Sequence, residues 1–377
     1  MHELSGKYCI VGVGATDFGK LPGRSSESLT VEAIKNALDD AGIEKAEIDA
    51  VLCKMPTSAP GLGYSLDISQ RLGIVPRVTT VIDQEGATNM GLITYAMISM
   101  ELGQCEAAVI SYGDNPRTGT HSYHGPKGEG APFGLRSPAA QYAMIARRHM
   151  HEYGTTHDQL GAIAVAARKH GAMNPKAQLQ KPLTLEEYNE GRWVAEPFHR
   201  DDCCLVSDGA LAIVVMSVEK ATSLGITNPV RIAGLGQGHT AWDVPYRETL
   251  TTSGALQSGR QAFAMAGLKP ADVDVAELYD CFTIVPLMTL EEYGFCEKGE
   301  GGAFVEGGRI ELGGEIPINT SGGLLSESGT PGMQHIIEAV RQVRGQCGDR
   351  QVPNVDVALV SNQGGIMHTH STLLLTA

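Results

Sequence analysis

The stretch ALDDAGIEKAEID at residues 37–49 returns later in the chain as AFAMAGLKPADVD at residues 262–274. Aligned without a gap, the two stretches share five identical residues and two pairs of similar apolar ones. Each copy predicts a helix, a glycine that stops it, a short linker and a strand that enters the core. The repeat indicates a duplicated chain built from two similar halves.

Strand and helix patterns alternate along the first half, which predicts an α/β fold with sheets covered by helices. The predicted strands lie at 7–14, 49–53, 78–82 and 107–112, and the predicted helices at 27–41 and 87–102. We expect the boundary between the halves within residues 217–230. The expected domains are residues 1–225, with a loop insertion at about 113–200, and residues 226–377.

The composition is that of an ordinary globular protein of 377 residues, 42% hydrophobic and 19% charged. A formal net charge of -14 disfavours nucleic acid as a partner, because an acidic surface repels phosphate groups. We find no apolar run of the roughly 18–20 residues that a membrane span needs, and no pattern of a secretion signal. Eight scattered cysteines without a CxxC pair predict reduced thiols in a cytoplasmic protein. We expect no metal site, and interpret Cys203 and Cys204, beside His199, as buried thiols near a turn.

Further stretches of the chain carry a resemblance to a known family. They are SDGALAIVVMS (207–217), ELYDCFT (277–283), GFCEKGEGGAFVEGG (294–308), NTSGGLLSE (319–327) and EAVRQVRG (338–345). With the repeat, they resemble the thiolase superfamily along the whole chain, in the branch related to sterol carrier protein-type thiolases. The resemblance implies a thiolase fold, with two duplicated α/β halves in a layered αβαβα core, and a homodimer. It also implies acyl-CoA substrates, with coenzyme A as part of the substrate and no covalently bound cofactor.

Two of the four positions that carry chemistry in this family are changed as follows. Thiolases place a nucleophilic cysteine at the start of the long helix of the first half, where the helix N-terminus lowers its pKa. The resemblance puts Gly86 there, and no cysteine lies between Cys53 and Cys105. The second position, Asn or His in the family, holds Tyr279, which can act as an acid or a base or can simply end a buried strand. Asp280 either orients the tyrosine or caps the helix that follows.

The third position, a histidine in the family, is occupied by Gly329. His335 follows shortly after, and we interpret it as a surface or helix-face histidine. The fourth position, a cysteine in a CxGG turn, is replaced within VSNQGG, which offers Ser361, Asn362, Gly364 and Gly365. His368 and His370 come next and would share one face of an extended segment. One of them is a candidate to approach the site, and a histidine at a subunit interface is the alternative.

Without a nucleophile, an acyl-enzyme cannot form at residue 86, but an enolate can still be stabilised. Backbone N–H groups of Gly86 and Ala87 are expected to form an oxyanion hole, and the glycine to leave room for a bulky substrate. These features suit retro-aldol cleavage of a β-hydroxyacyl-CoA. The sequence is similar to thiolase-like aldolases of steroid side-chain thioesters, which use two tyrosines. Tyr279 matches the first, whereas Gly329 stands in place of the second and leaves the second acid or base unassigned.

The resemblance also implies a small partner protein with a zinc ribbon and an OB-like fold, which helps to hold coenzyme A. In this chain, the loop at 113–130 combines glycines with Arg117, His121, His124 and Lys127. This loop is expected either to touch the dimer partner or a pantetheine arm, with Arg117 as a substrate contact, or to be a solvated excursion.

Two other functions compete with the lyase. The first is an acyltransferase or thiolase of unusual mechanism, with Cys281 near Tyr279 as its nucleophile. The second is a non-catalytic subunit that binds CoA esters or lipids, which the change of all four catalytic positions favours. A trapped acyl group on a cysteine would identify the first, and retention of a ligand without any product would identify the second.

Overall fold

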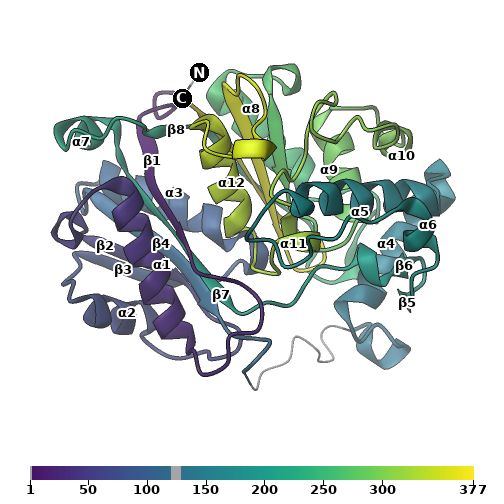
Figure 1. Ribbon diagram of the computed structural model, residues 1–377, viewed down its shortest axis with the longest axis horizontal. Helices are drawn as coiled ribbons and strands as arrows, with labels where there is room; N and C mark the ends of the chain where they lie inside the picture. Colours follow the sequence, from purple (N-terminus) through teal and green to yellow (C-terminus); the bar gives the residue numbers. More distant parts are fainter. Residues whose placement is uncertain (1, 120–128) are drawn as a thin grey trace.

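A computed structural model describes residues 2–119 and 129–377 of the chain. Within them, a nine-stranded mixed sheet has the strand order β3-β2-β4-β7-β1-β8-β11-β10-β9 (Figure 1). Its strands are β1 (Tyr8–Ala15), β2 (Ala50–Lys54), β3 (Val78–Ile82), β4 (Ala107–Asp114), β7 (Gly209–Ser217), β8 (Val230–His239), β9 (Val275–Leu278), β10 (Val357–Gly364) and β11 (Thr369–Thr376). No helix in the described ranges has the length and apolar character required to cross a bilayer.

The strand order repeats itself on the two sides of the β1–β8 pair. Reading outward, β1, β7, β4 and β2 have β8, β11, β10 and β9 as their counterparts. The end strand β3 is matched on the other side by an isolated bridge between Ala276 and Ile318. Within the sheet, β1 and β8 join the halves through two register pairs, Cys9 with Arg231 and Ile10 with Val230. This arrangement is the one expected of a duplicated α/β chain.

Both copies of the sequence repeat adopt the same local structure. Helix α1 (Ser26–Ala41) ends at Gly42 and α8 (Ala255–Ala266) ends at Gly267, each glycine with a positive φ near 70°. A residue with a side chain is strained in this left-handed region, which is why both copies carry glycine there. A short 3₁₀ turn then leads into β2 in the first copy and into β9 in the second.

Three apolar clusters define the layers of the core. One lies between α1, α2 (Tyr64–Leu72) and the first half of the sheet. A second contains α3 (Thr88–Glu101) and α12 (Met333–Val343), which contact strands of both halves and so form the central layer. The third packs the second half of the sheet against α8 and α9 (Ile284–Tyr293). Helices and sheet halves therefore alternate as αβαβα, and Figure 1 shows α1 and α2 at the opposite side from α9.

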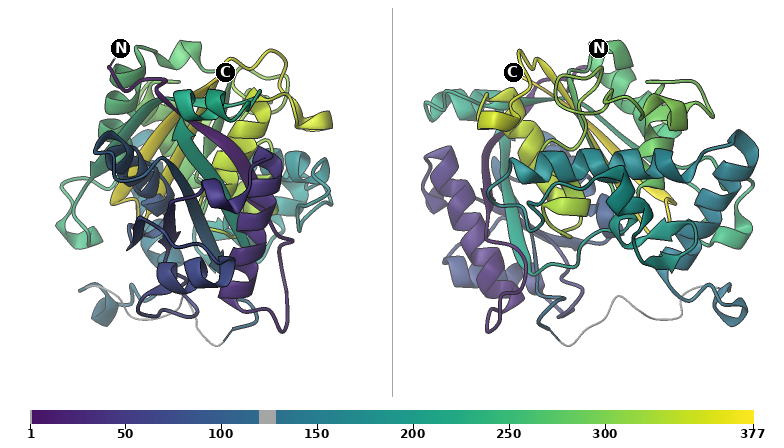
Figure 2. Two further views of the ribbon diagram at one scale, coloured as in Figure 1. Left: turned by 90° about the vertical axis from the view of Figure 1, so that its left-hand side faces the viewer. Right: turned by 45° about the vertical axis from the view of Figure 1, so that its right-hand side comes forward.

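The insertion between β4 and β7 packs on the second half of the molecule, as both figures show (Figure 2). It contains α4 (Pro138–Tyr153), α5 (His157–Ala172), α6 (Leu185–Asn189) and the hairpin β5 (Trp193–Ala195) and β6 (Phe198–His199). A buried contact of 3.1 Å between His149 Nε2 and the Glu291 carboxylate joins α4 to α9. The remaining helices are short: α7 (Val218–Ser223), α10 (Gly301–Phe304) and α11 (Gly323–Ser326).

Candidate active site

Gly86 and Tyr279 meet where the two halves face each other. Gly86 lies in the 3₁₀ turn Glu85–Ala87 between β3 and α3, and Tyr279 directly follows β9. A Cβ atom on residue 86 would lie 2.6 Å from the Tyr279 hydroxyl oxygen and 2.1 Å from the Gln363 carbonyl oxygen. Both distances are far below van der Waals contact. The expectation of free room beside Gly86 was wrong, because the tyrosine hydroxyl occupies the space that a side chain would fill.

The turn before α3 is held by a short network of hydrogen bonds. The Thr88 hydroxyl donates to the Glu85 carbonyl at 2.7 Å and accepts from the Gln84 N–H at 2.7 Å. The Ala87 N–H donates to the Gln84 carbonyl at 3.1 Å. Because the Ala87 N–H is already bonded within the turn, it is a poor candidate for the oxyanion hole that was expected of Gly86 and Ala87. Gly86 remains the candidate donor.

Tyr279 is held from two sides. Its N–H donates to the Ser361 carbonyl at 2.9 Å, and its half-buried ring stands edge-on to His335 at a centroid distance of 6.2 Å. Asp280, next in the chain, accepts hydrogen bonds from the N–H groups of Leu324 at 2.7 Å and Leu325 at 3.4 Å. Asp280 therefore caps α11. The alternative that it caps the helix that follows it, α9, was wrong.

His335 lies in α12, as a helix-face histidine would, but it is fully buried, so the alternative of a surface histidine was wrong. Its Nε2 lies 3.3 Å from the Asp280 carboxylate and its Nδ1 lies 3.6 Å from the Glu277 carboxylate. Burial by itself would lower the pKa of His335, but the two carboxylates outweigh it and raise the pKa to about 9. His335 is thus favoured as a buried imidazolium between two carboxylates, and its ring packs against the ring of Tyr279. The helical periodicity of the sequence did not reveal that His335 is buried, because other parts of the fold cover α12 on most sides.

Gly329 lies in a position that no side chain can occupy. A Cβ atom there would lie 1.7 Å from the Leu205 carbonyl oxygen, and the Gly329 N–H donates to the Ser207 hydroxyl at 2.8 Å. Arg117 reaches this region only indirectly: it donates to Gln178 at 3.1 Å, and Gln178 donates to Ser207 at 2.6 Å. The remaining polar residues predicted in the loop, His121, His124 and Lys127, lie outside the described residues.

The segment that replaces the second family cysteine is the end of β10 and the turn that follows it, and its side chains bond to neighbouring parts of the fold. Ser361 accepts from the Tyr293 hydroxyl at 2.7 Å, and Asn362 donates to the Gly332 carbonyl at 3.2 Å. The backbone of Gly364 approaches the Gln84 carbonyl, and Gly365, at φ 61°, abuts the ring of His368. The group that faces Gly86 is therefore the backbone carbonyl of Gln363.

His368 and His370 do not share one face, which corrects the expectation. Strand β11 begins only at Thr369, and Met367 has a φ of 60°, so the alternation of an extended segment does not apply. His368 Nε2 faces the Glu85 carboxylate at 3.6 Å, beside Gly86. His370 points instead to the Ser253 hydroxyl at 3.2 Å, and burial first of all lowers its pKa to about 3. Of the two, His368 is the one that lies beside Glu85 and stays a candidate site residue.

The sequence reasoning missed three polar groups around Tyr279. The Gln363 amide donates to the Tyr142 hydroxyl at 2.5 Å and to the Cys281 sulfur at 3.1 Å, and Tyr142 donates to the Gly365 carbonyl at 2.7 Å. Tyr142 comes from α4 of the insertion and carries no motif that could have singled it out. Glu85 was missed as well, although it is the direct neighbour of Gly86.

Comparisons with known proteins show the family of the chain. The family described as Thiolase C-terminal domain-like matches residues 236–377. The steroid side-chain-cleaving aldolase of Thermomonospora curvata is 39% identical, with 92% of each chain covered. This chain belongs to the thiolase superfamily. The 17-hydroxy-3-oxo-4-pregnene-20-carboxyl-CoA lyase of Mycobacterium tuberculosis is also 39% identical, over 96% of this chain and 98% of that one. The solved Ltp2-ChsH2(DUF35) aldolase superposes with a TM-score of 0.90 at 37% identity, over 99% and 98% of the two chains.

The surroundings of Cys281 disfavour it as a substitute nucleophile in this member of the thiolase superfamily. Its side chain is buried, and burial holds the pKa of its thiol well above the usual range. The thiolate needed for attack on a thioester is therefore disfavoured. Cys203 and Cys204, interpreted as buried thiols, are partly buried, and burial likewise raises the pKa of Cys204 to about 12.

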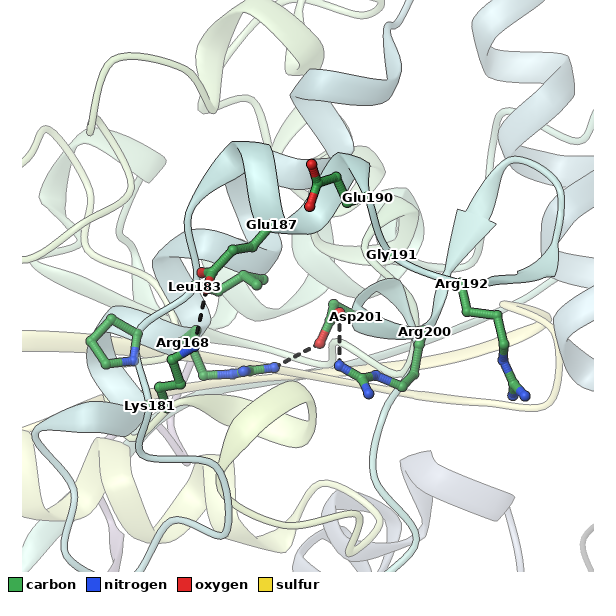
Figure 3. A pocket seen from close by; sticks show the side chains of 10 residues that line it. Arg168, Lys181, Leu183, Glu187, Glu190, Gly191, Arg192, Arg200 and Asp201 are labelled. Atoms are coloured by element: carbon green, nitrogen blue, oxygen red, sulfur yellow. Dashed lines mark hydrogen bonds and ion pairs between the residues drawn. The ribbon is translucent and has the colours of Figure 1, made fainter.

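A separate cavity of about 430 Å³ lies in the insertion (Figure 3). It is lined by Arg168, Lys181, Pro182, Leu183, Glu187, Glu190, Gly191, Arg192, Arg200 and Asp201. Most of its charges pair with each other: Arg168 and Arg200 both contact Asp201, at 2.9 and 3.4 Å, and Lys181 contacts Glu187 at 3.0 Å. In Figure 3 the Arg192 side chain points away from these pairs. The cavity has mixed charge and contains no residue of the Gly86–Tyr279 site.

The described residues contain one group with metal-ligand geometry, in which ligand atoms of His157, His199 and Asp202 lie within 4.8 Å of one another. The Asp202 carboxylate already accepts from the Thr283 hydroxyl at 2.6 Å and from the His199 N–H at 2.6 Å. His157 Nε2 lies 2.9 Å from the Pro197 carbonyl oxygen. Asp202 and His157 are thus already hydrogen-bonded, whereas the buried Nδ1 of His199 has no hydrogen-bond partner among the described residues. We assign no metal to the group.

Proposed function

We propose that the protein is a lyase that cleaves a β-hydroxyacyl-CoA by a retro-aldol reaction. The observation that carries the proposal is the Tyr279 hydroxyl, which stands beside Gly86 where thiolases have their nucleophile. The activities named for relatives at 39% identity over nearly the whole chain support the same reaction class.

In the proposed reaction, the β-hydroxyl loses its proton and its oxygen becomes the carbonyl oxygen of an aldehyde or ketone. The Cα–Cβ bond breaks, and its electron pair passes into the thioester enolate. The Gly86 N–H is assigned to the enolate oxygen and the Tyr279 hydroxyl to proton transfer at Cα, which gives the shortened acyl-CoA. Coenzyme A takes part only as a component of the substrate and product.

We also propose a homodimer. Strand β3 is an end strand of the sheet, and its side chains from Thr79 to Ile82 are only partly buried. Apolar side chains near this edge and on the adjoining helices α2 and α3 are exposed, namely Leu62, Leu66, Val75, Tyr95, Ile98 and Leu102. An open edge with an apolar surround is a surface that proteins usually cover. We propose that a second copy of the chain binds this surface.

A further proposed partner is a small protein with a zinc ribbon and an OB-like fold. It is supported by the similar solved aldolase, whose name pairs Ltp2 with ChsH2(DUF35). We infer a cytoplasmic location on the ground that all eight cysteines are free thiols.

Product analysis tests the proposed reaction. The protein, co-purified with its partner, is incubated with a panel of β-hydroxyacyl-CoA esters that differ in the bulk of the β-substituent. The proposal expects equal molar amounts of carbonyl product and shortened acyl-CoA, with the intact mass of the protein unchanged. An increase in protein mass by one acyl group would instead support acyl transfer. Retained ligand without product would support a binding subunit.

A further inference from the structure

The proposed reaction needs a second proton-transferring group, and the carboxylates around Tyr279 differ in their ability to supply it. Asp280 is fully buried and is held by the N–H groups of α11 and by His335. Glu277 is also fully buried, with its oxygens directed to Thr320 and His335. Asp83 lies 3.6 Å from the ammonium group of Lys54. None of these three combines exposure with a position beside Gly86.

Glu85 combines an exposed side chain with a position beside Gly86. It precedes Gly86 directly, and its side chain is 42% exposed. The carboxylate also lies close to the turn that carries Gly365, since a Cβ atom on that glycine would be 2.6 Å from Glu85 Oε2. Its backbone has a φ of 53°, a region that glycine adopts readily and glutamate rarely. A glutamate kept in this conformation next to the candidate site indicates that its side chain is needed there.

His368 faces the same carboxylate from the buried side. Its Nδ1 accepts a hydrogen bond from the Ile366 N–H at 3.3 Å, so the ring hydrogen of the neutral imidazole resides on Nε2. This Nε2 lies 3.6 Å from Glu85 Oε2, a distance that a small movement on substrate binding would shorten to a hydrogen bond. Burial, helped by the charge of Arg247, lowers the pKa of His368 to about 4. The neutral imidazole therefore presents its Nε2–H toward the carboxylate and does not compete for the substrate proton.

We propose that Glu85 is the general base that removes the proton from the substrate β-hydroxyl, and that His368 is its positioning residue. This assignment rests on the proposed lyase function. Glu85 takes the hydroxyl proton as the Cα–Cβ bond breaks, and Tyr279 gives its proton to Cα of the enolate. The proton on Glu85 then passes through solvent to the Tyr279 phenolate. The cycle therefore returns both groups to their starting states and requires no other reactant.

The left-handed backbone at residue 85 allows a test that does not endanger folding. Glu85→Gly removes the carboxylate and places glycine where φ is positive, so the variant is expected to fold at least as well as the wild type. We expect kcat to fall about 10²- to 10⁴-fold, the usual range for a lost general base. Formate added to this variant is expected to restore activity in a concentration-dependent manner, which a purely structural role would not allow. Glu106→Gln, an exposed carboxylate paired with Lys220, serves as the control and is expected to stay within about threefold of wild type.

The positioning role of His368 is tested by its conservative variant. His368→Gln keeps a neutral donor and is expected to retain at least about tenfold more activity than His368→Leu, with the difference in kcat and not in KM. Wild-type activity in Glu85→Gly, or loss of activity that formate does not restore, would overturn the assignment of Glu85 alone. If the wild-type protein releases no carbonyl product from any β-hydroxyacyl-CoA, the proposed function fails and the assignment fails with it.

Discussion

The hydroxyl oxygen of Tyr279 lies 2.6 Å from the point where a Cβ atom on Gly86 would stand. The tyrosine and the missing cysteine side chain therefore occupy one space, and the site can hold one or the other. This exclusion links the loss of the thiolase nucleophile to the gain of a tyrosine that is distant in the sequence.

Replacing Gly86 with cysteine is accordingly expected to restore no thiolase activity. The new side chain must displace both Tyr279 and the Gln363 carbonyl, so Gly86→Cys should lower the free energy of unfolding by about 1–3 kcal/mol and abolish cleavage. Chemical denaturation measures the first effect. Gly61→Cys is the matched control, because nothing lies within 4 Å of a Cβ atom there. Thiolysis by Gly86→Cys with unchanged stability would contradict the exclusion.

The buried His335 should make stability depend on pH. Its folded pKa of about 9 exceeds the unfolded value of about 6.5, so its stabilising contribution is complete below about pH 6.5. The contribution is lost as the pH rises through about 9, and amounts to about 3 kcal/mol at 1.36 kcal/mol per pKa unit. Unfolding free energies of wild type and His335→Gln should therefore converge as the pH rises from 6.5 to beyond 9. Parallel pH curves would show that His335 is neutral in the folded protein.

The thiol of Cys281 should be dispensable for chemistry. Burial keeps its pKa high, so Cys281→Ala is expected to retain kcat within about threefold of wild type and to show the same product ratio. A loss of all activity in Cys281→Ala, together with an acyl adduct on Cys281 in the wild type, would favour the acyltransferase.

Tyr142 should affect catalysis indirectly, through its hydrogen bonds to Gln363 and Gly365. Tyr142→Phe removes the part-buried hydrogen bond to the Gly365 carbonyl and the buried one from the Gln363 amide. We expect a loss of about 1–3 kcal/mol in the free energy of unfolding and a decrease in kcat, because the Gln363 carbonyl packs against Gly86. Thermal unfolding and steady-state kinetics measure the two effects. Unchanged kcat at reduced stability would show that the insertion supports the fold and not the site.

The fold and part of the site could be predicted from the sequence. The repeat that ends at Gly42 and Gly267 indicated two similar halves, and the absence of a cysteine near Gly86 was readable directly. The reason for that glycine was not readable, because Tyr279 reaches it only after the halves stack. The environment of His335 depends on its place in the central layer, which the periodicity of one helix does not report. His368 and His370 diverge because Met367, at φ 60°, breaks the extended conformation on which the prediction relied.

The central claim is that the Tyr279 hydroxyl transfers a proton during C–C cleavage without a covalent intermediate. Its most direct test is the rate of carbonyl release by Tyr279→Phe, compared with Tyr64→Phe, whose hydroxyl contacts Thr30 far from the site in the first half. The account predicts a loss of about 10²-fold or more for Tyr279→Phe, near wild-type rates for Tyr64→Phe and an unmodified protein mass throughout. Carbonyl release by Tyr279→Phe at the wild-type rate would contradict the account.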